Sequence, residues 1–216
     1  MADLITLDVL DRPDGGRRAL RALPTIPGVR HRIHLATSRF GTSPGRNLTL
    51  RRIALITVWE PGADTEAQRL PRAKEHWHVL GELTRASFDA PWRGWTPDTD
   101  GATPLDLDEP ALVFISGDLR ARGVIPFVRA IFGVVEQAFE HSGYLGGLSL
   151  YSSLRNTTSC SAWRTYADAR DYAFGRGPHL LAMRRDHVGG HHRTHWFSRI
   201  RPLRSPGHRA GWPRGS

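Results

Sequence analysis

The sequence predicts an α+β fold, in which two fused ferredoxin-like βαββαβ units form one intrachain α/β barrel of the dimeric α/β-barrel type. The order strand, helix, strand, strand, helix, strand occurs twice, and a proline-rich acidic stretch separates the two occurrences. Trp59 and Trp163 each end the third strand of their unit and precede its second helix. Two open four-stranded sheets hide their edges and apolar faces by packing into a single eight-stranded barrel.

The first ferredoxin-like half spans residues 1–96. Apolar, β-branched runs bounded by Gly and Pro predict its strands at 4–10, 29–37, 53–59 and 81–88. A brief helical stretch is expected at 17–23. Asp64 or Thr65 can cap a second helix that runs toward Leu80.

The second half spans residues 111–203 and follows a linker at 97–110, the end of the proline-rich stretch 89–110. Its strands are expected at 111–116, 144–152, 158–163 and 196–203. The best helix of the chain is predicted at 125–141, where Phe127, Ile131, Val134 and Val135 share one apolar stripe. Another helix is expected from 167 onward, and 204–216 is predicted to be a disordered basic tail.

Composition narrows the class of protein. The chain has 216 residues, of which 39% are hydrophobic and 24% charged, a balance typical of a globular fold. Its one cysteine, Cys160, excludes an intramolecular disulfide and a Cys-rich metal site. No apolar run is long enough to cross a bilayer, and the first residues lack a signal core. These features predict a soluble, cytoplasmic protein without a membrane span.

The charge balance is strongly basic. Thirty Lys and Arg residues against 21 Asp and Glu residues give a net charge of +9, and Lys74 is the one lysine. Genome composition, a nucleic-acid surface and a pocket for an anionic ligand each explain such an excess. The arginines are scattered along the chain, and the strands lack the aromatic pattern of RNA-recognition sheets. Nucleic acid is therefore the less favoured partner, and a basic nucleic-acid-binding ferredoxin-like protein stays an alternative.

An ordered series of motifs resembles the spheroidene monooxygenase family, haem enzymes that oxygenate carotenoids, and related proteins of bacterial secondary metabolism. The matching segments are 23–28, 52–59, 91–94, 161–163, 172–174, 177–185 and 197–203. The resemblance implies a duplicated ferredoxin-like barrel and haem b, with its iron, as cofactor. The chain departs from the family at Gly190-His191-His192, where the family tends to have Gly-Trp-Phe.

His179 is the candidate metal ligand, because the resemblance covers its position and an imidazole suits haem iron. Gly177-Pro178 precedes it and fixes the start of a helix. Beside it, Arg176 and Arg184 could pair with the haem propionates, and Trp163 and Phe174 could line the macrocycle. Solvated charges for the two arginines and plain core packing for the aromatic residues are the simpler alternatives.

Four further histidines, His187, His191, His192 and His195, lie within nine residues. We expect His191 and His192 to be catalytic, as acid or base groups on the distal side of the haem. His187 and His191 have the i, i+4 spacing that can bind a divalent metal on a helix, although Gly189-Gly190 interrupts it. Asp186 is expected to point away from that face. An exposed polar loop and a non-haem metal site are the alternatives.

The resemblance implies a haem-dependent oxidoreductase, monooxygenase-like, that acts on a small natural-product intermediate. As an oxygenase it would take electrons from a separate donor, because the sequence has no flavin or reductase signature. The alternative haem chemistries are dehydration, peroxidation and nitrogen–nitrogen bond formation. A small-molecule substrate is the expected partner, and an oligomer is possible.

Overall fold

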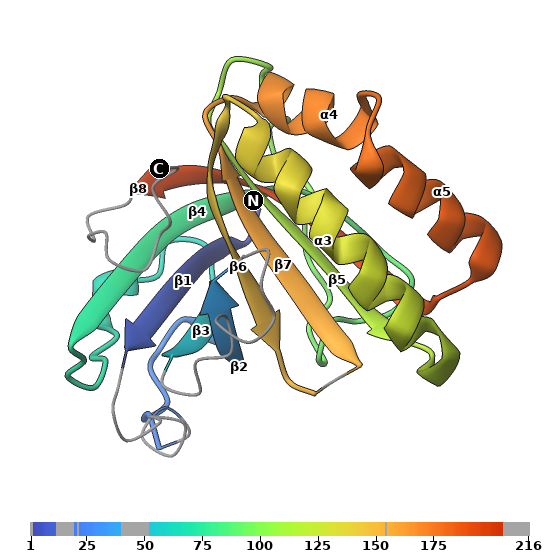
Figure 1. Cartoon of the computed structure of the whole chain (residues 1–216). Coiled ribbons are helices and arrows are strands. Elements are labelled where there is room, and N and C mark those ends of the chain that lie inside the picture. Colours follow the sequence, from blue (N-terminus) through green and yellow to red (C-terminus); the bar gives the residue numbers. More distant parts are fainter. Residues whose placement is uncertain (1, 12–19, 21, 40–51, 154, 205–216) are drawn as a thin grey trace.

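A computed structural model describes residues 2–11, 20, 22–39, 52–153 and 155–204 (Figure 1). Its strands are β1 (Leu4–Asp11), β2 (Val29–Arg39), β3 (Arg52–Trp59), β4 (Glu75–Phe88), β5 (Ala111–Leu119), β6 (Tyr144–Tyr151), β7 (Asn156–Trp163) and β8 (His192–Arg204). Its helices are α3 (Val124–Glu140), α4 (Tyr166–Phe174) and α5 (Pro178–Gly189), with short 3₁₀ turns η1 (Thr65–Ala67) and η2 (Ala121–Gly123).

The eight strands form one closed ring of antiparallel pairs, in the order β1-β3-β2-β6-β7-β5-β8-β4. Within it, the first half contributes β4-β1-β3-β2 and the second half contributes β8-β5-β7-β6, which is the same order twice. The two halves join where β2 pairs with β6 and where β4 pairs with β8. The predicted duplicated ferredoxin-like fold is therefore confirmed, and one chain is enough to close the ring.

The inside of the ring is the main hydrophobic core. Strand side chains alternate between two faces, so in β1 Ile5, Leu7 and Val9 belong to this core while Asp8 faces outward. The other members of the core are Ile33, Leu35, Ala54, Ile56, Val58, Trp77, Val79, Leu83, Trp92, Trp95, Leu112, Phe114, Leu148, Leu150, Cys160, Ala162, Trp196 and Ile200. Apolar burial of this extent drives ring closure.

The predicted helix from Asp64 or Thr65 toward Leu80 is wrong. Asp64 does cap a turn, because its Oδ1 accepts the backbone N–H of Glu66 at 3.0 Å, but the turn ends after three residues. Beyond it, Trp77 and Val79 alternate with outward residues and pair with β1, so the period-two pattern prevails over helix capping. Most of the helix expected at 17–23, and residues 205–216 of the expected tail, lie outside the described residues.

The helices of the second half agree with the sequence. The 125–141 helix is α3, and the helix from 167 onward divides into α4 and α5 around Gly175–Gly177. All three lie over the outer face of the second half (Figure 1). The last strand starts at His192, four residues earlier than expected. Among the described residues, none of the helices is long and apolar enough to cross a membrane.

The connection between the halves is tied to the ring at both ends. Asp3, which is fully buried, binds Arg30 and accepts hydrogen bonds from Trp95 Nε1 at 3.1 Å and from Asp98 N at 3.0 Å. At the other end, Arg201 of β8 donates to Glu109 at 2.9 and 3.0 Å. The linker boundaries at 97–110 remain a prediction.

Asp3→Ala is expected to lower the free energy of unfolding by about 3 kcal/mol, because it leaves buried donors of Trp95 and Asp98 without an acceptor. Urea unfolding measures the change. Asp108→Ala, in the exposed part of the same connection, is the control and should stay within about 0.5 kcal/mol of wild type. Equal effects of the two variants would contradict the anchoring role of Asp3.

Candidate functional site

The start of α5 is fixed against α3. Pro178 occupies the first turn of α5, where its missing N–H leaves no hydrogen bond unmade. Gln137 of α3 accepts the backbone N–H of His179 through Oε1 at 2.8 Å and so satisfies one free donor of the helix end. A Cβ on Gly177 would lie 2.7 Å from the Gln137 amide, so a larger residue there would displace the side chain that accepts the His179 N–H. The position of His179 is thereby set.

The imidazole of His179 is buried, with 7% of the residue exposed. Its Nδ1 lies 3.3 Å from the carbonyl oxygen of Ala173, and its ring packs on Tyr172, which packs on Trp163. Burial lowers the pKa of His179, and the Ala173 hydrogen bond opposes this only in part. The neutral ring therefore donates from Nδ1, and its Nε2 has no hydrogen-bond partner among the described residues. That is the state in which an imidazole binds a metal.

The apolar stripe of α3 is only partly covered. Val135 and Ala138 are its buried residues, whereas Phe127 and Ile131 are half-buried. On the outer face of the same half, Ile115 of β5 is 40% exposed. The C-terminal part of α3 packs through Ala138 on the sheet, but the N-terminal part leaves apolar side chains incompletely packed. This partly covered surface lies toward His192, which the Phe127 ring contacts edge-on at 5.4 Å between ring centroids.

The other predicted cofactor residues are not gathered around His179. Trp163 is 2% exposed and its Nε1 donates to Ser161 Oγ at 2.9 Å, so it supports His179 through Tyr172. Phe174 is 60% exposed and lines a separate hollow at the end of α4. Arg176 and Arg184 are exposed, and no ion pair joins them to the residues that the structure describes.

A second group of titratable side chains lies at the other end of α5. Asp186 Oδ2 lies 2.7 Å from His192 Nδ1 and 2.8 Å from His195 Nε2. Its Oδ1 accepts the backbone N–H groups of His191 and His192 at 3.0 and 3.2 Å. We name Asp186, His192 and His195 the α5 cluster; its ligand atoms lie within 4.8 Å of one another. His187 is exposed and outside this cluster.

The electrostatics of the α5 cluster favour a carboxylate beside neutral imidazole. Burial acts to raise the pKa of Asp186, but hydrogen bonds from His195 and His192 outweigh it and keep that pKa below its usual range. Burial lowers the pKa of His192, against the opposing charge of Asp186. His192 is thus a neutral ring at pH 7, oriented by a carboxylate, which suits a group that accepts and returns a proton.

The expectation that Asp186 points away from a helical face shared by His187 and His191 stays a prediction. Its contacts with the side chains of His192 and His195 were not foreseen, and they arise from the turn after α5. Gly190 has φ 57°, the left-handed conformation that ends a helix and reverses the chain. This turn brings His192 and His195 back onto Asp186. The pair Gly189-Gly190 was the available signal, since glycine after a helical run marks such a reversal.

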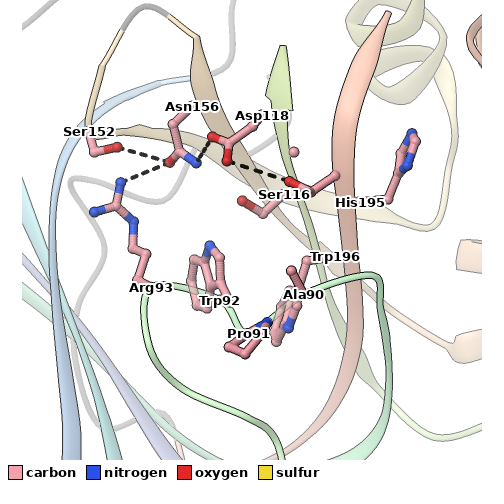
Figure 2. A pocket seen from close by; sticks show the side chains of 12 residues that line it. Ala90, Pro91, Trp92, Arg93, Ser116, Asp118, Ser152, Asn156, His195 and Trp196 are labelled. Atoms are coloured by element: carbon pink, nitrogen blue, oxygen red, sulfur yellow. Dashed lines mark hydrogen bonds between the residues drawn. The ribbon is translucent and has the colours of Figure 1, made fainter. Parts of the chain in front are cut away.

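A hollow of about 380 Å³ lies where β5, β8 and the connection between the halves meet (Figure 2). Asn156 is the centre of its polar wall: its Oδ1 accepts from Arg93 and Ser152, each at 2.9 Å, and its Nδ2 donates to Asp118 at 2.6 Å. His195 also lines the hollow, so the α5 cluster reaches it directly.

The apolar wall of the hollow is a pair of tryptophans. Trp92 stacks on Trp196 at 4.6 Å between ring centroids, and the indole N–H groups of both are buried without a hydrogen-bond partner among the described residues. The backbone groups of Trp92 and Trp95 bond to each other across a tight turn in which Arg93 has φ 52°. Two neighbouring residues of the turn, Trp92 and Arg93, thus line the hollow with an apolar and a charged group.

Fold and site together define a single-chain, duplicated ferredoxin-like protein with a buried histidine on the last helix. No protein-family model and no curated protein matches the chain. The solved structure of an aldoxime dehydratase in complex with butyraldoxime is 10% identical, with 93% of this chain and 79% of that chain covered and a TM-score of 0.53. A second aldoxime dehydratase structure is 13% identical, covers 93% and 81%, and has a TM-score of 0.51.

A ferredoxin-fold protein from Listeria monocytogenes, related to antibiotic biosynthesis monooxygenases, is 7% identical over 92% of this chain and 95% of its own, with a TM-score of 0.34. At identities this low, the two aldoxime dehydratase structures show a shared fold and nothing about activity. None of these three structures is a spheroidene monooxygenase, so membership of that family stays a prediction.

The lowered pKa of His179 predicts a pH dependence of stability. Because the unfolded chain takes up the proton near the ordinary pKa of about 6.5 and the folded chain does so only at lower pH, this histidine makes stability fall as the pH drops below that value. In urea unfolding between pH 7.5 and 5.5, His179→Gln should reduce this fall in the free energy of unfolding. His187→Gln, at an exposed position of the same helix, should show the same dependence of the free energy of unfolding on pH as wild type. Equal dependence on pH in all three proteins would contradict the assignment.

Proposed function

We propose that this protein is a haem-dependent oxidoreductase that transforms a small organic substrate, with His179 as the axial iron ligand. The observation that carries the proposal is the state of His179: buried, neutral, anchored through Nδ1 on the Ala173 carbonyl, and with no hydrogen-bond partner for Nε2 among the described residues. An axial imidazole of a haem protein needs these same properties, since the hydrogen bond at one nitrogen orients the other.

Aromatic packing beside His179 supports an apolar macrocycle, because its ring packs on Tyr172, which packs on Trp163. The half-buried Phe127 lies farther along α3, where its ring contacts His192 edge-on at 5.4 Å between centroids. Arg176 and Arg184 lie before and after His179, and their guanidinium groups are free among the described contacts to pair with propionates. Phe174 lines a different hollow, and we leave it out of the proposed site.

Bound haem would supply the redox chemistry of its iron. His192 would accept and return a proton, because its Nδ1–H is held by Asp186 and the free Nε2 of the neutral ring is the exchanging atom. His195 shares the same Asp186 oxygen and lines the hollow of about 380 Å³, so one carboxylate joins α5 to a space for substrate. There, the Trp92 ring offers an apolar surface and Arg93 a charge, which fits a substrate with an apolar body and a polar group. An oxygenase reaction would need a separate electron donor, and a dehydration would not.

Titration of the full-length, haem-free protein with haemin tests the proposal. Wild type should bind one haem per chain with a sharp Soret band. His179→Ala removes the iron ligand and should weaken haem binding about 100-fold or more and shift the band, while added imidazole restores much of the wild-type spectrum. His187→Ala, on the same helix and exposed, is the matched control and should bind as wild type does.

Two outcomes would overturn the assignment. One is wild-type protein that takes up no stoichiometric haem. The other is His179→Ala with an unchanged Soret band, combined with loss of the band in His192→Gln, which would transfer the ligand role to the α5 cluster.

A second candidate function is a non-haem metal enzyme centred on the α5 cluster. One carboxylate and two imidazoles form the ligand set of many divalent-metal sites, and this cluster borders the hollow through His195. In that case the isolated protein would contain zinc or iron, and His192→Gln would lower the metal content by one equivalent per chain while His179→Ala keeps it.

A further inference from the structure

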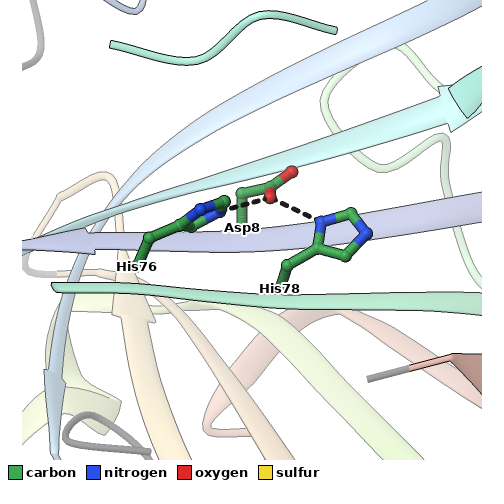
Figure 3. Close-up of side chains that lie close together, drawn as sticks. All are labelled: Asp8, His76 and His78. Carbon is green, nitrogen blue, oxygen red and sulfur yellow. Dashed lines mark hydrogen bonds and ion pairs between the residues drawn. The ribbon is translucent and has the colours of Figure 1, made fainter. Parts of the chain in front are cut away.

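A second His–Asp group joins strands β1 and β4 of the first half (Figure 3). His76 and His78 are two residues apart on β4, so both project from the same face of the strand. Asp8 of the neighbouring strand β1 stands directly opposite His78 in the register. His76 and His78 are 68 and 70 residues from Asp8 in the sequence. The closed ring thus brings three potential metal ligands side by side.

The contacts within this group centre on one carboxylate oxygen. Asp8 Oδ1 lies 2.8 Å from His76 Nε2 and 2.7 Å from His78 Nδ1. Gln68 Nε2 approaches Asp8 Oδ2 at 3.4 Å, and Thr57 Oγ1 donates to Gln68 Oε1 at 3.1 Å. The ligand atoms of Asp8, His76 and His78 lie within 4.8 Å of one another.

The burial of Asp8 requires a positive partner. The residue is 0% exposed, and a carboxylate withdrawn from water is costly unless a cation balances it. The other two carboxylates at this end of the chain have an arginine: Asp3 pairs with Arg30, and Asp11 with Arg52 at 3.4 Å. Asp8 has no Arg or Lys partner among the described residues, only the two imidazoles and Gln68. A metal ion between these side chains would provide the charge that the other two carboxylates receive from arginine.

We propose that Asp8, His76 and His78 bind one divalent transition-metal ion, with Zn²⁺ the best fit. Two imidazole nitrogens and one carboxylate oxygen are ligands that Zn²⁺ prefers, whereas Ca²⁺ and Mg²⁺ prefer oxygen alone. The His76 side chain is 42% exposed, so solvent reaches the site and water can complete the coordination. Gln68, held by Thr57, would orient the second carboxylate oxygen, as outer groups do around bound metals.

Binding needs only a small rearrangement. Tetrahedral bonds of about 2.0–2.1 Å to Zn²⁺ set ligand atoms about 3.3 Å apart, slightly farther than the 2.7 and 2.8 Å that now separate the imidazole nitrogens from Asp8. The exposed His76 ring can turn outward to supply that space. The metal would then link β1 to β4, two strands of the first half, without any part of the α5 cluster or of a haem.

The test is zinc binding by the tag-free, full-length, haem-free protein after chelator treatment, followed by calorimetry with zinc chloride and by metal analysis after gel filtration. His192→Gln serves as the background in every sample, so that the α5 cluster is disabled and one remaining site is counted. In this background we expect one Zn²⁺ per chain and a rise in melting temperature on zinc addition. His76→Gln and His78→Gln should each weaken binding about 100-fold or more and abolish that rise.

Because the His76 side chain is exposed, we expect His76→Gln to keep the fold, so that its loss of zinc binding does not reflect misfolding. His187→Gln, an exposed histidine outside both groups, is the control for surface imidazole and should bind zinc as the background does. The proposal is overturned if the background protein takes up no zinc at 100 times the protein concentration, or if His76→Gln and His78→Gln bind as tightly as the background. Haem is absent from every sample. A failure to bind zinc would therefore not bear on the proposed role of His179, which the haemin titration tests.

Discussion

Two strand pairings, β2 with β6 and β4 with β8, determine which side chains of the sheet face the core and which face outward. They join two open sheets into a closed ring, and closure fixes which side of every strand faces the core. A slip of one residue in β4 would exchange Trp77 and Val79 with His76 and His78, and so would bury the histidines inside. The chemical groups on the outer face, from Asp8 on β1 to Ile115 on β5, are therefore placed by the packing of apolar residues on the other face.

Helix α5 sets the spacing of the residues in the candidate site. His179 and Asp186 are seven residues apart, two helical turns, so they lie on the same face of α5 and about 10 Å apart along its axis. Gln137 fixes the first turn, and the left-handed Gly190 fixes the return of the chain after the last. A single rigid element thus sets the distance between a buried imidazole and a carboxylate–imidazole group, which loops would hold less accurately.

Local pattern was sufficient to predict most of the fold, and it failed where a contact joins distant segments. The runs that became β1, β3 and β5 are short, apolar and β-branched, and α3 has an apolar stripe at helical spacing, so the sequence predicts where these elements lie. The supposed helix before Leu80 shows the limit: a good cap at Asp64 was outweighed by pairing of β4 with β1. For the site, Gly177-Pro178 predicted where His179 lies. The pairing of Asp8 with His76 and His78 depends on the ring, and no local signal marks it.

The stacked indoles of Trp92 and Trp196 have an optical consequence. Their ring centroids are 4.6 Å apart at an interplanar angle of 24°, and Trp95 lies 5.6 Å from Trp196, so the electronic transitions of the three rings interact strongly. Rings held this closely and slightly twisted give a paired signal of opposite signs in far-ultraviolet circular dichroism, and they transfer excitation among themselves before emitting. Since two of the three line the hollow at the ring's edge, the protein carries its own chromophore beside that space, and no external label is needed to follow a molecule that enters it.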